Sequence, residues 1–321
     1  MKSFTVNKND SGQRLDKFIT KSVPALPKSL MYKYIRLKRI KVNGKKSDIS
    51  YKLNENDLIE LYISDEFFTP PVLKYDFLSA STKLTIIYED ENIILCDKPV
   101  GLLSHPDENE YNDTLITRIK RYLYEKGEFL PDDENSFAPA LVNRIDRNTG
   151  GIVIAAKNSQ SLRVLNEKLK LRQIDKYYLC VINGVLKNKS DTLVSWMTKD
   201  SDKNQVKVYN HEIQGAKTMK TQYKVLAENR DYSLLEVKLL TGRTHQIRAQ
   251  FASIGHPLVG DGKYGKNSQN KKAGYFKQLL YSYKIVFNFT DDAENLNYLS
   301  GKSFEVENVP FKEMFEIGKF C

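Results

Sequence analysis

A single carboxylate lies between two arginines in the string LVNRIDRNTGGIVIAAKN, residues 141–158. Asp146 has Arg144 and Arg147 on either side, and a Thr-Gly-Gly turn leads from it into an apolar run. Aspartate is common in turns, where it bonds nearby backbone amides, so one interpretation is an ordinary turn with a solvated ion pair. The other is a reactive carboxylate beside an anionic polymer, because the turn leads directly into a strand that we expect to be buried.

A second polar cluster occurs in LLTGRTHQIRAQFASIGHPLVGDGKYG, residues 239–265. Arg243, His245, Gln246 and Arg248 place four polar side chains within six positions. A planar guanidinium binds carboxylates and phosphates through two parallel hydrogen bonds. One arginine is therefore suited to pair with a carboxylate, and the other polar groups are suited to contact phosphates or base edges.

The same string contains Gly260, Gly262 and Gly265, which match the pattern G-x-G-x-x-G. A dinucleotide site needs a strand before this pattern, a helix that opens at it and an acidic residue about 20 positions further on. The next residues are GKNSQNKKAGYF, without a helical apolar period or a suitable acid. We therefore exclude a Rossmann site and expect residues 266–272 to form a solvated loop.

Two further strings contain groups that could take part in chemistry. In DKYYLCVING, residues 175–184, the period of a strand places Tyr178 and Cys180 on one face. In DKPVGLLSHP, residues 97–106, one glycine and two prolines predict a rigid loop that carries His105. Tyrosine on a strand is more often structural than catalytic, and His105 is more often a surface residue than a base.

The first part of the chain predicts a small unit of two helices and a few strands over residues 13–63. We expect the second helix to begin near Ser29 as its N-cap, and Asn43-Gly44 to form a tight turn between strands. From residue 28 to residue 46 there are eight basic side chains and no acidic one. Such a run is either a solvated face or a phosphate-binding surface. Its candidate RNA contacts are Lys33, Arg36, Lys38, Arg39, Lys41 and Lys45.

The chain divides into three segments by composition. We expect residues 1–65 to form the small unit and residues 66–83, with Pro70-Pro71 and a Ser/Thr-rich end, to form a linker. Residues 84–321 mix strand and helix patterns and predict one larger domain.

The net charge of +10, from 50 basic and 40 acidic side chains, favours a polyanionic partner. The N-terminus MKSFTVNKNDSGQR lacks the apolar core of a signal peptide, and no apolar run is long enough to span a membrane, so we expect a cytoplasmic protein. Three distant cysteines and four scattered histidines support neither a disulfide framework nor a metal site. We expect no metal, no cofactor, no membrane partner and no obligate protein partner.

Taken in order, the four strings resemble the RluA-type pseudouridine synthases, in particular the RluC- and RluD-like enzymes of the ribosomal large subunit. The strings YEDENIILCDKPVGLLSHP, NRIDRNTGGIVIAAKN, KYYLCVING and TGRTHQIRAQFASIGHPLVGD match successive motifs of that family. RLDKF, the basic helix and the VNGK turn resemble the S4 RNA-binding module. The resemblance covers nearly the whole chain.

The resemblance implies an α+β fold with a mixed, largely antiparallel central sheet flanked by helices, preceded by a small α+β S4-like domain. It implies an isomerase that flips a uridine out of RNA, detaches the uracil from C1′ and reattaches it through carbon 5, without a cofactor. By motif position, Asp146 would be the catalytic aspartate and Arg248 its ion-pair partner. Tyr178 would stack on the base or assist proton transfer, although an ordinary tyrosine pKa near 10 makes it a reluctant base. Further RNA contacts would come from Arg144, which would enter the stack, and from Arg243, His245 and Gln246.

Three positions depart from the family pattern. Asn143 stands where the family usually has His, Gly150 where it has Ser, and Cys180 where it has Ala. All three flank the reactive residues, so we expect them to affect positioning or substrate preference more than activity.

The resemblance leaves several alternatives open. Relatives with an S4 module most often modify 23S ribosomal RNA, which we expect here, and a transfer RNA substrate is the alternative. A non-catalytic RNA-binding or ribosome-assembly protein would have the same charge and the same S4 module. A glycoside-type hydrolase is less well supported, because typical glycosidases use two carboxylates and these motifs offer one.

Overall fold

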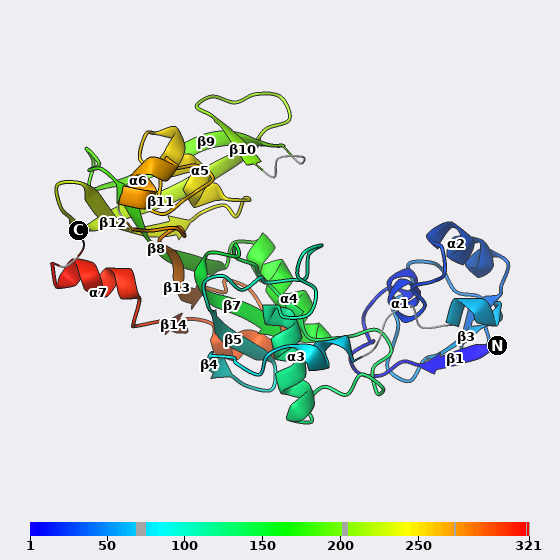
Figure 1. The fold of residues 1–321 in the computed structure, drawn as a ribbon. Coiled ribbons are helices and arrows are strands. Elements are labelled where there is room, and N and C mark those ends of the chain that lie inside the picture. The colour runs from blue at the N-terminus through cyan, green and yellow to red at the C-terminus, as the bar shows by residue number, and fades with distance from the viewer. Residues whose placement is uncertain (69–74, 201–204, 273, 319, 321) are drawn as a thin grey trace.

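The chain folds into a small N-terminal unit and a larger C-terminal unit, which lie side by side along the molecule (Figure 1). The N-terminal unit comprises residues 1–68 and the C-terminal unit residues 75–320. These boundaries are set by two separate groups of buried apolar side chains, one in each unit. A computed structural model describes residues 1–68, 75–200, 205–272, 274–318 and 320.

The N-terminal unit packs two helices on a three-stranded antiparallel sheet with the order β1-β3-β2. The N-cap of helix α2 is Pro27, two residues before the predicted Ser29, which lies inside the helix. Asn43 and Gly44 both have positive φ, as the predicted tight turn requires. The elements are β1 (Lys2–Thr5), α1 (Leu15–Ser22), α2 (Lys28–Arg36), β2 (Ile40–Val42) and β3 (Leu58–Leu61).

The connection between the units is shorter than the linker we predicted over residues 66–83. Phe67 and Phe68, in a 3-10 turn over Asp65–Phe68, pack against the N-terminal core. Phe77, in a second 3-10 turn over Asp76–Ser79, is buried in the C-terminal core. Both ends of the predicted linker thus belong to folded units, and Pro70-Pro71 lie outside the described residues.

The C-terminal unit is built on an eleven-stranded sheet. Nine of its strands follow the order β10-β9-β11-β12-β8-β13-β7-β5-β4, and the other two, β14 and β6, pair with β13 and β7. Every described pairing is antiparallel except β7 with β13. The predicted α+β class with a mixed, largely antiparallel sheet is confirmed. The strands are β4 (Ile86–Glu89), β5 (Ile93–Lys98), β6 (Ala140–Leu141), β7 (Gly150–Ala156), β8 (Ile174–Asn183), β9 (Ser190–Asp200), β10 (Gln205–Tyr209), β11 (Lys217–Glu228), β12 (Tyr232–Leu239), β13 (Leu280–Phe287) and β14 (Ser303–Glu305).

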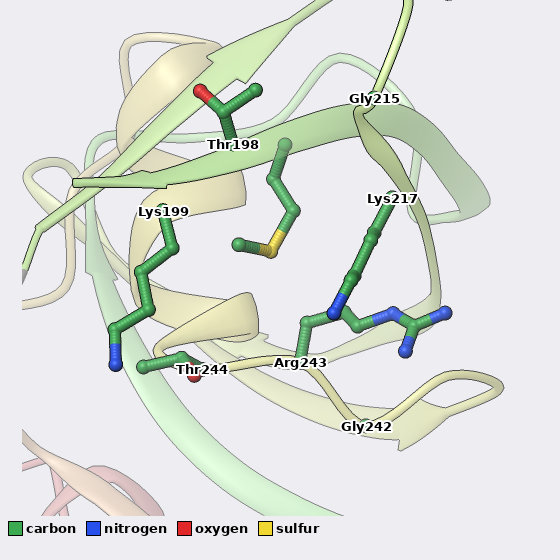
Figure 2. Close-up of a pocket in the computed structure, with 8 residues that line it drawn as sticks. Thr198, Lys199, Gly215, Lys217, Gly242, Arg243 and Thr244 are labelled. Atoms are coloured by element: carbon green, nitrogen blue, oxygen red, sulfur yellow. The ribbon is translucent and has the colours of Figure 1, made fainter. Parts of the chain in front are cut away.

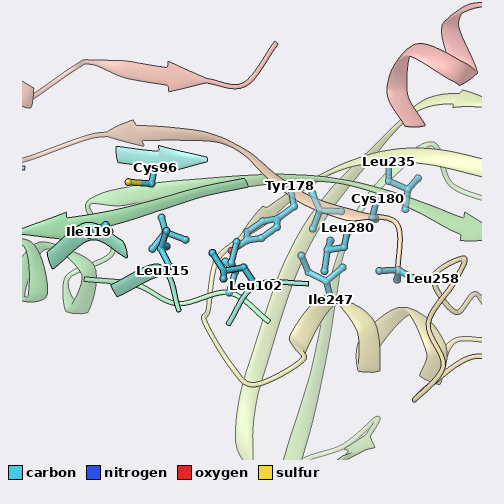
Figure 3. Packing of buried hydrophobic residues seen from close by; sticks show 14 of the residues in the cluster. Cys96, Leu102, Leu115, Ile119, Tyr178, Cys180, Leu235, Ile247, Leu258 and Leu280 are labelled. Carbon is cyan, nitrogen blue, oxygen red and sulfur yellow. The ribbon is translucent and has the colours of Figure 1, made fainter. Parts of the chain in front are cut away.

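Helices cover both faces of this sheet. Helices α3 and α5 pack on the face that carries Tyr178 and Cys180, as predicted from the strand period, and Figure 3 shows these side chains beside Leu115 and Ile247. Helices α4 and α7 pack on the opposite face. The predicted loop at residues 266–272 instead contains a short helix, α6. The helices are α3 (Leu115–Glu125), α4 (Ser159–Lys170), α5 (Gln246–Ser253), α6 (Asn267–Lys272) and α7 (Pro310–Glu316), with a 3-10 turn over Glu294–Leu299.

Within the described part of the chain, none of these helices combines the length and apolar character that crossing a membrane requires.

Candidate active site

Asp146 lies in the loop that joins β6 to β7, on the face of the sheet covered by α3 and α5. The loop is fixed on both sides of the aspartate: the Ser104 hydroxyl donates to the carbonyl of Ile145 at 2.9 Å, and the Thr149 amide donates to the carbonyl of Asp146 at 3.0 Å. The Asp146 side chain is 29% exposed. Its carboxylate is thus held on a rigid loop and remains accessible to a substrate.

Arg248, in the first turn of α5, joins Asp146 to a second carboxylate. One terminal nitrogen, Nη1, donates to Asp146 Oδ2 at 2.7 Å. The edge of the guanidinium formed by Nε and Nη2 donates two hydrogen bonds to Asp261, at 2.7 Å and 3.0 Å. We call these three residues the Asp-Arg-Asp cluster. Within the described residues Asp146 Oδ1 accepts no hydrogen bond, so this oxygen is free to contact a substrate.

Asp261 is fully buried, so its charge must be balanced by its neighbours. Its Oδ1 also accepts the backbone amides of Lys263 at 2.9 Å and Tyr264 at 3.1 Å. Burial by itself raises the pKa of the Asp261 carboxyl, but the hydrogen bonds and charge of Arg248 hold it below its usual value. Burial likewise lowers the pKa of Arg248, and its two carboxylate partners raise it above the usual value. Arg248 and Asp261 therefore form a charged, buried ion pair.

The glycine pattern that does not form a dinucleotide site serves as the scaffold of Asp261. Gly260 has φ +78°, and a Cβ there would lie 2.1 Å from the carbonyl oxygen of Lys277, so only glycine fits. The amide of Asn270, in α6, bonds the backbone of both Gly260 and Asp261 at 3.0 and 3.1 Å. This close backbone approach fixes the loop that presents Asp261 to Arg248.

His245 is the N-cap of α5 and adopts a left-handed conformation with φ 50°. Its Nδ1 lies 2.9 Å from the Tyr264 hydroxyl, and its Nε2 lies 3.9 Å from Asp146 Oδ2. Burial lowers the pKa of His245, Asp146 opposes this effect, and Arg248 adds to it. The imidazole is therefore neutral at neutral pH and directed toward the carboxylate.

Tyr178, on β8, is buried among apolar side chains that include Leu102 and Ile247 (Figure 3). Burial raises its pKa to about 12, a hydrogen bond with Ser282 opposes this effect, and the nearby Asp146 charge adds to it. The phenol therefore keeps its proton at neutral pH. It is suited to pack against a base or to donate a hydrogen bond, and less suited to accept a proton.

Comparison with known proteins decides the family. Residues 92–253 match the RNA pseudouridylate synthase family model, and residues 13–59 match the S4 domain model. A protein of Mycoplasma capricolum, named an uncharacterized RNA pseudouridine synthase, is 35% identical over 94% of this chain and 96% of its own length. The chain belongs to the RNA pseudouridylate synthase family.

More distant relatives agree with this assignment. Ribosomal large subunit pseudouridine synthase C of Haemophilus ducreyi is 28% identical to this synthase over 91% of this chain and 89% of its own length. The solved structure of human RNA pseudouridylate synthase domain containing 4 superposes with a TM-score of 0.56 at 18% identity, over 74% of this chain and 92% of that chain, which shows a shared fold. The synthase is thus an RNA-modifying isomerase with an S4 domain.

Besides Asp261, sequence reasoning missed a second charged residue of the synthase site, Lys98. Its side chain is completely buried, and Nζ donates to three backbone carbonyls, including those of Leu102 at 2.7 Å and Arg147 at 3.1 Å. Burial lowers the pKa of Lys98 to about 7, and Asp146 and Asp97 act in the opposite direction. Lys98 therefore ties the DKP loop to the residue after Asp146. The only signal in the sequence was a lysine at the end of an apolar strand, where charged residues are rare.

Gln246 does not have the RNA-contacting position that we predicted. Its side chain is 3% exposed. The amide nitrogen donates to the carbonyl of Lys220 at 3.0 Å and to the Thr221 hydroxyl at 2.8 Å, and the amide oxygen accepts from Thr241 and the backbone of Arg243. Gln246 therefore joins the start of α5 to β11 and has no bonding capacity left for RNA.

Apart from His245, whose side chain is 9% exposed, the other predicted RNA contacts lie at or near the surface. Arg144 and Arg243 are exposed. In the N-terminal unit Lys41 is half-buried, with its ammonium 5.1 Å from the centre of the Tyr62 ring. The remaining five basic side chains are exposed: Lys33, Arg36, Lys38, Arg39 and Lys45.

The three departures from the family pattern have structural explanations. A Cβ on Gly150 would lie 2.4 Å from the ring of Tyr281, whose hydroxyl donates to Asp97 at 2.6 Å, so a serine does not fit beside this tyrosine. Asn143 accepts the amide of Ile154 at 2.8 Å and so fixes the aspartate loop to β7. Cys180 is fully buried, and burial raises the pKa of its thiol. It is an apolar core residue.

Proposed function

We propose that this synthase converts specific uridines of 23S ribosomal RNA to pseudouridine in the cytoplasm, with Asp146 as the catalytic residue. The names of its relatives support the substrate, because those of synthases C and D refer to the ribosomal large subunit. The S4 domain at residues 13–59 supports a structured RNA. The observation that carries the role of Asp146 is its geometry: one oxygen is held by Arg248, and the other is open on a partly exposed rigid loop.

In the reaction that we propose, Asp146 Oδ1 contacts the flipped nucleotide while Arg248 holds Oδ2. The bond between C1′ and N1 breaks, the uracil turns, and a new bond forms between C1′ and carbon 5. The proton displaced from carbon 5 leaves, and N1 gains one, so the product has the composition of the substrate. Arg248 has a positioning role, because Asp261 fixes its guanidinium before the RNA arrives.

Access to the glycosidic bond requires the uridine to leave the helix stack. We assign Arg144, exposed on the loop two residues before Asp146, to the space that the flipped base leaves. Tyr178 would pack against the uracil with its phenol protonated, in keeping with its raised pKa. The basic side chains of α2 and the following hairpin would bind phosphates further along the RNA.

The test is to map pseudouridine at single-nucleotide resolution in unmodified ribosomal and transfer RNA after incubation with the synthase. The Asp146→Asn variant is the comparison, and Asp231→Asn, which removes an exposed carboxylate, is the matched control. We expect new pseudouridine in large-subunit RNA with the unaltered protein and with Asp231→Asn only. Modification confined to transfer RNA would overturn the proposal of a ribosomal RNA substrate. Normal modification by Asp146→Asn would overturn the catalytic role proposed for Asp146.

A further inference from the structure

A hollow of about 350 Å³ opens between the ends of β9 and β11 and the loop before α5 (Figure 2). Lys199 and Lys217 extend from the two strands toward the loop that carries Arg243. Three of the eight lining residues are cations, and none is acidic. We call this hollow the cationic pocket; it is lined by Met197, Thr198, Lys199, Gly215, Lys217, Gly242, Arg243 and Thr244.

Strand register places the two lysines on the same face of the sheet as the active site. Lys217 pairs with Met197, and Lys199 lies two residues beyond Met197 on β9. Because side chains alternate along a strand, both lysines share the face of Met197. That face packs against Ala249 of α5 and against Tyr264, which contacts the Arg248 guanidinium.

Among the residues that the structure describes, the cations of the pocket have no paired counter-charge. In the described part of the chain neither Lys199 nor Lys217 forms an ion pair, and the guanidinium of Arg243 donates only to the carbonyl of Thr218, at 3.3 Å. Lys176, on β8, has its Nζ 3.7 Å from the position of a Cβ on Gly242, and burial lowers its pKa. Lys199, Lys217 and Arg243 line the same hollow, like charges repel one another, and a bound anion would relieve that repulsion.

The pocket is connected to the active site through the backbone. Thr244, in the pocket wall, directly precedes His245, whose Nε2 lies 3.9 Å from Asp146. Consecutive Cα atoms are about 3.8 Å apart, so Arg243 is only about 8 Å along the chain from His245. The pocket wall and the residue beside Asp146 therefore belong to one short loop.

We propose that the cationic pocket binds a backbone phosphate of the substrate RNA close to the target uridine, through Lys199, Lys217 and Arg243. This inference rests on the proposed function, and it adds a binding site formed by the C-terminal unit to the basic surface of the S4 domain. Phosphate contacts fix the register of a nucleic acid on a protein. The pocket would hold the strand in the register that delivers the uridine to Asp146.

The experiment measures RNA affinity and its salt dependence for Lys199→Gln/Lys217→Gln, with Lys220→Gln/Lys224→Gln as the control. The control removes two exposed lysines from the opposite face of β11. We expect the pocket variant to lose roughly tenfold in affinity at low salt, as the loss of charge-assisted hydrogen bonds predicts. The slope of log K against log salt should fall by about 0.7 for each phosphate that the variant no longer neutralises, and the control should leave both quantities unchanged.

A second measurement locates the phosphate. Each phosphate near the target uridine in a short substrate RNA is replaced in turn by a neutral methylphosphonate. We expect one position to weaken binding by the unaltered protein and to have no effect on the pocket variant. Equal affinities and equal salt slopes for the pocket and control variants would overturn the proposal that this pocket binds a phosphate. Failure of the proposed function would look different, because the unaltered protein would then form no pseudouridine while the binding difference persisted.

Discussion

The basic side chains of the N-terminal unit are exposed except for the half-buried Lys41, whereas Arg248, Asp261 and Lys98 of the C-terminal unit are buried. In the N-terminal unit, Lys33, which is exposed, makes no ion pair within the described residues. In the C-terminal unit these buried charges near Asp146 are held by hydrogen bonds of 2.7 to 3.1 Å.

The difference reflects what each group of charges has to do. Exposed cations bind a polyanion by releasing its counterions, which needs accessibility but no fixed geometry. A catalytic carboxylate needs one orientation, and buried charged hydrogen bonds supply it at the cost of desolvation. Removing charge should therefore reduce RNA affinity in the first region, and folding stability and turnover in the second.

The strongest test of this comparison is Arg248→Ala. It leaves Asp261 buried and unpaired, so we expect the free energy of unfolding to fall by about 3–5 kcal/mol. Turnover of bound RNA should fall at least about a hundredfold, as for the loss of a preorganised charged donor. Chemical denaturation and single-turnover kinetics measure the two effects. A large loss of RNA affinity with normal turnover would show that Arg248 acts on the polymer and not on Asp146.

Asp261→Asn sharpens the same test, because it keeps the Arg248–Asp146 contact. We expect a loss of about 2 kcal/mol in unfolding free energy and a smaller loss of turnover than in Arg248→Ala. The folded pKa of Asp261 is lowered, so its stabilisation is fully present above the unfolded pKa of about 3.9 and is lost as the pH falls through the folded pKa. Stability curves below about pH 4 should therefore converge for the two proteins, and parallel curves would contradict the charged network.

The pH dependence of stability tests how much the burial of a charged Lys98 side chain costs. Its folded pKa is about 7 and an unfolded lysine has a pKa of about 10.4, so between these values the unfolded chain binds more protons. The stability of the unaltered protein relative to Lys98→Met should therefore rise with pH across this range, by up to about 1.4 kcal/mol per pH unit. Denaturation at several pH values measures the difference. A constant difference would mean that Lys98 stays charged throughout, held by its three carbonyls.

Replacing Lys33, Arg36 and Lys45 by glutamine together should have the smallest effect on the fold. We expect the unfolding free energy to change by less than about 0.5 kcal/mol, since these are exposed surface positions. The slope of log K against log salt should fall by about 2, as expected when three phosphates are no longer neutralised. An unchanged slope would show that these three side chains do not contact RNA. A large loss of stability would contradict the difference that we draw between exposed and buried charges.

Local patterns predicted much of the fold. The two-residue period of β8 placed Tyr178 and Cys180 on one face, and Asn43-Gly44 predicted a turn, because both depend on neighbours in the chain. The predictions that failed depend on distant partners. Gln246 is as polar as its neighbours in the motif, and only the packing of α5 on β11 directs it inward.

Helix α6 could not be predicted from the sequence, because its run of lysine and asparagine has no apolar period. Asn270 becomes structural because the loop at Gly260 comes close enough to bond with it. Lys98 was missed for the same kind of reason, as its carbonyl partner at Arg147 lies 49 residues away in the chain.

By itself the sequence determined the motifs, their order and the local elements that carry them, because propensity, turn chemistry and side-chain period act over a few residues. The motif resemblance predicted the pairing of Arg248 with Asp146, which is confirmed, but only tertiary structure showed that the same guanidinium also binds Asp261. Asp146 and Arg248 are 102 positions apart, and only the sheet brings them to 2.7 Å. The same sheet places Lys199 and Lys217 opposite Arg243, since strand register sets which side chains share a face.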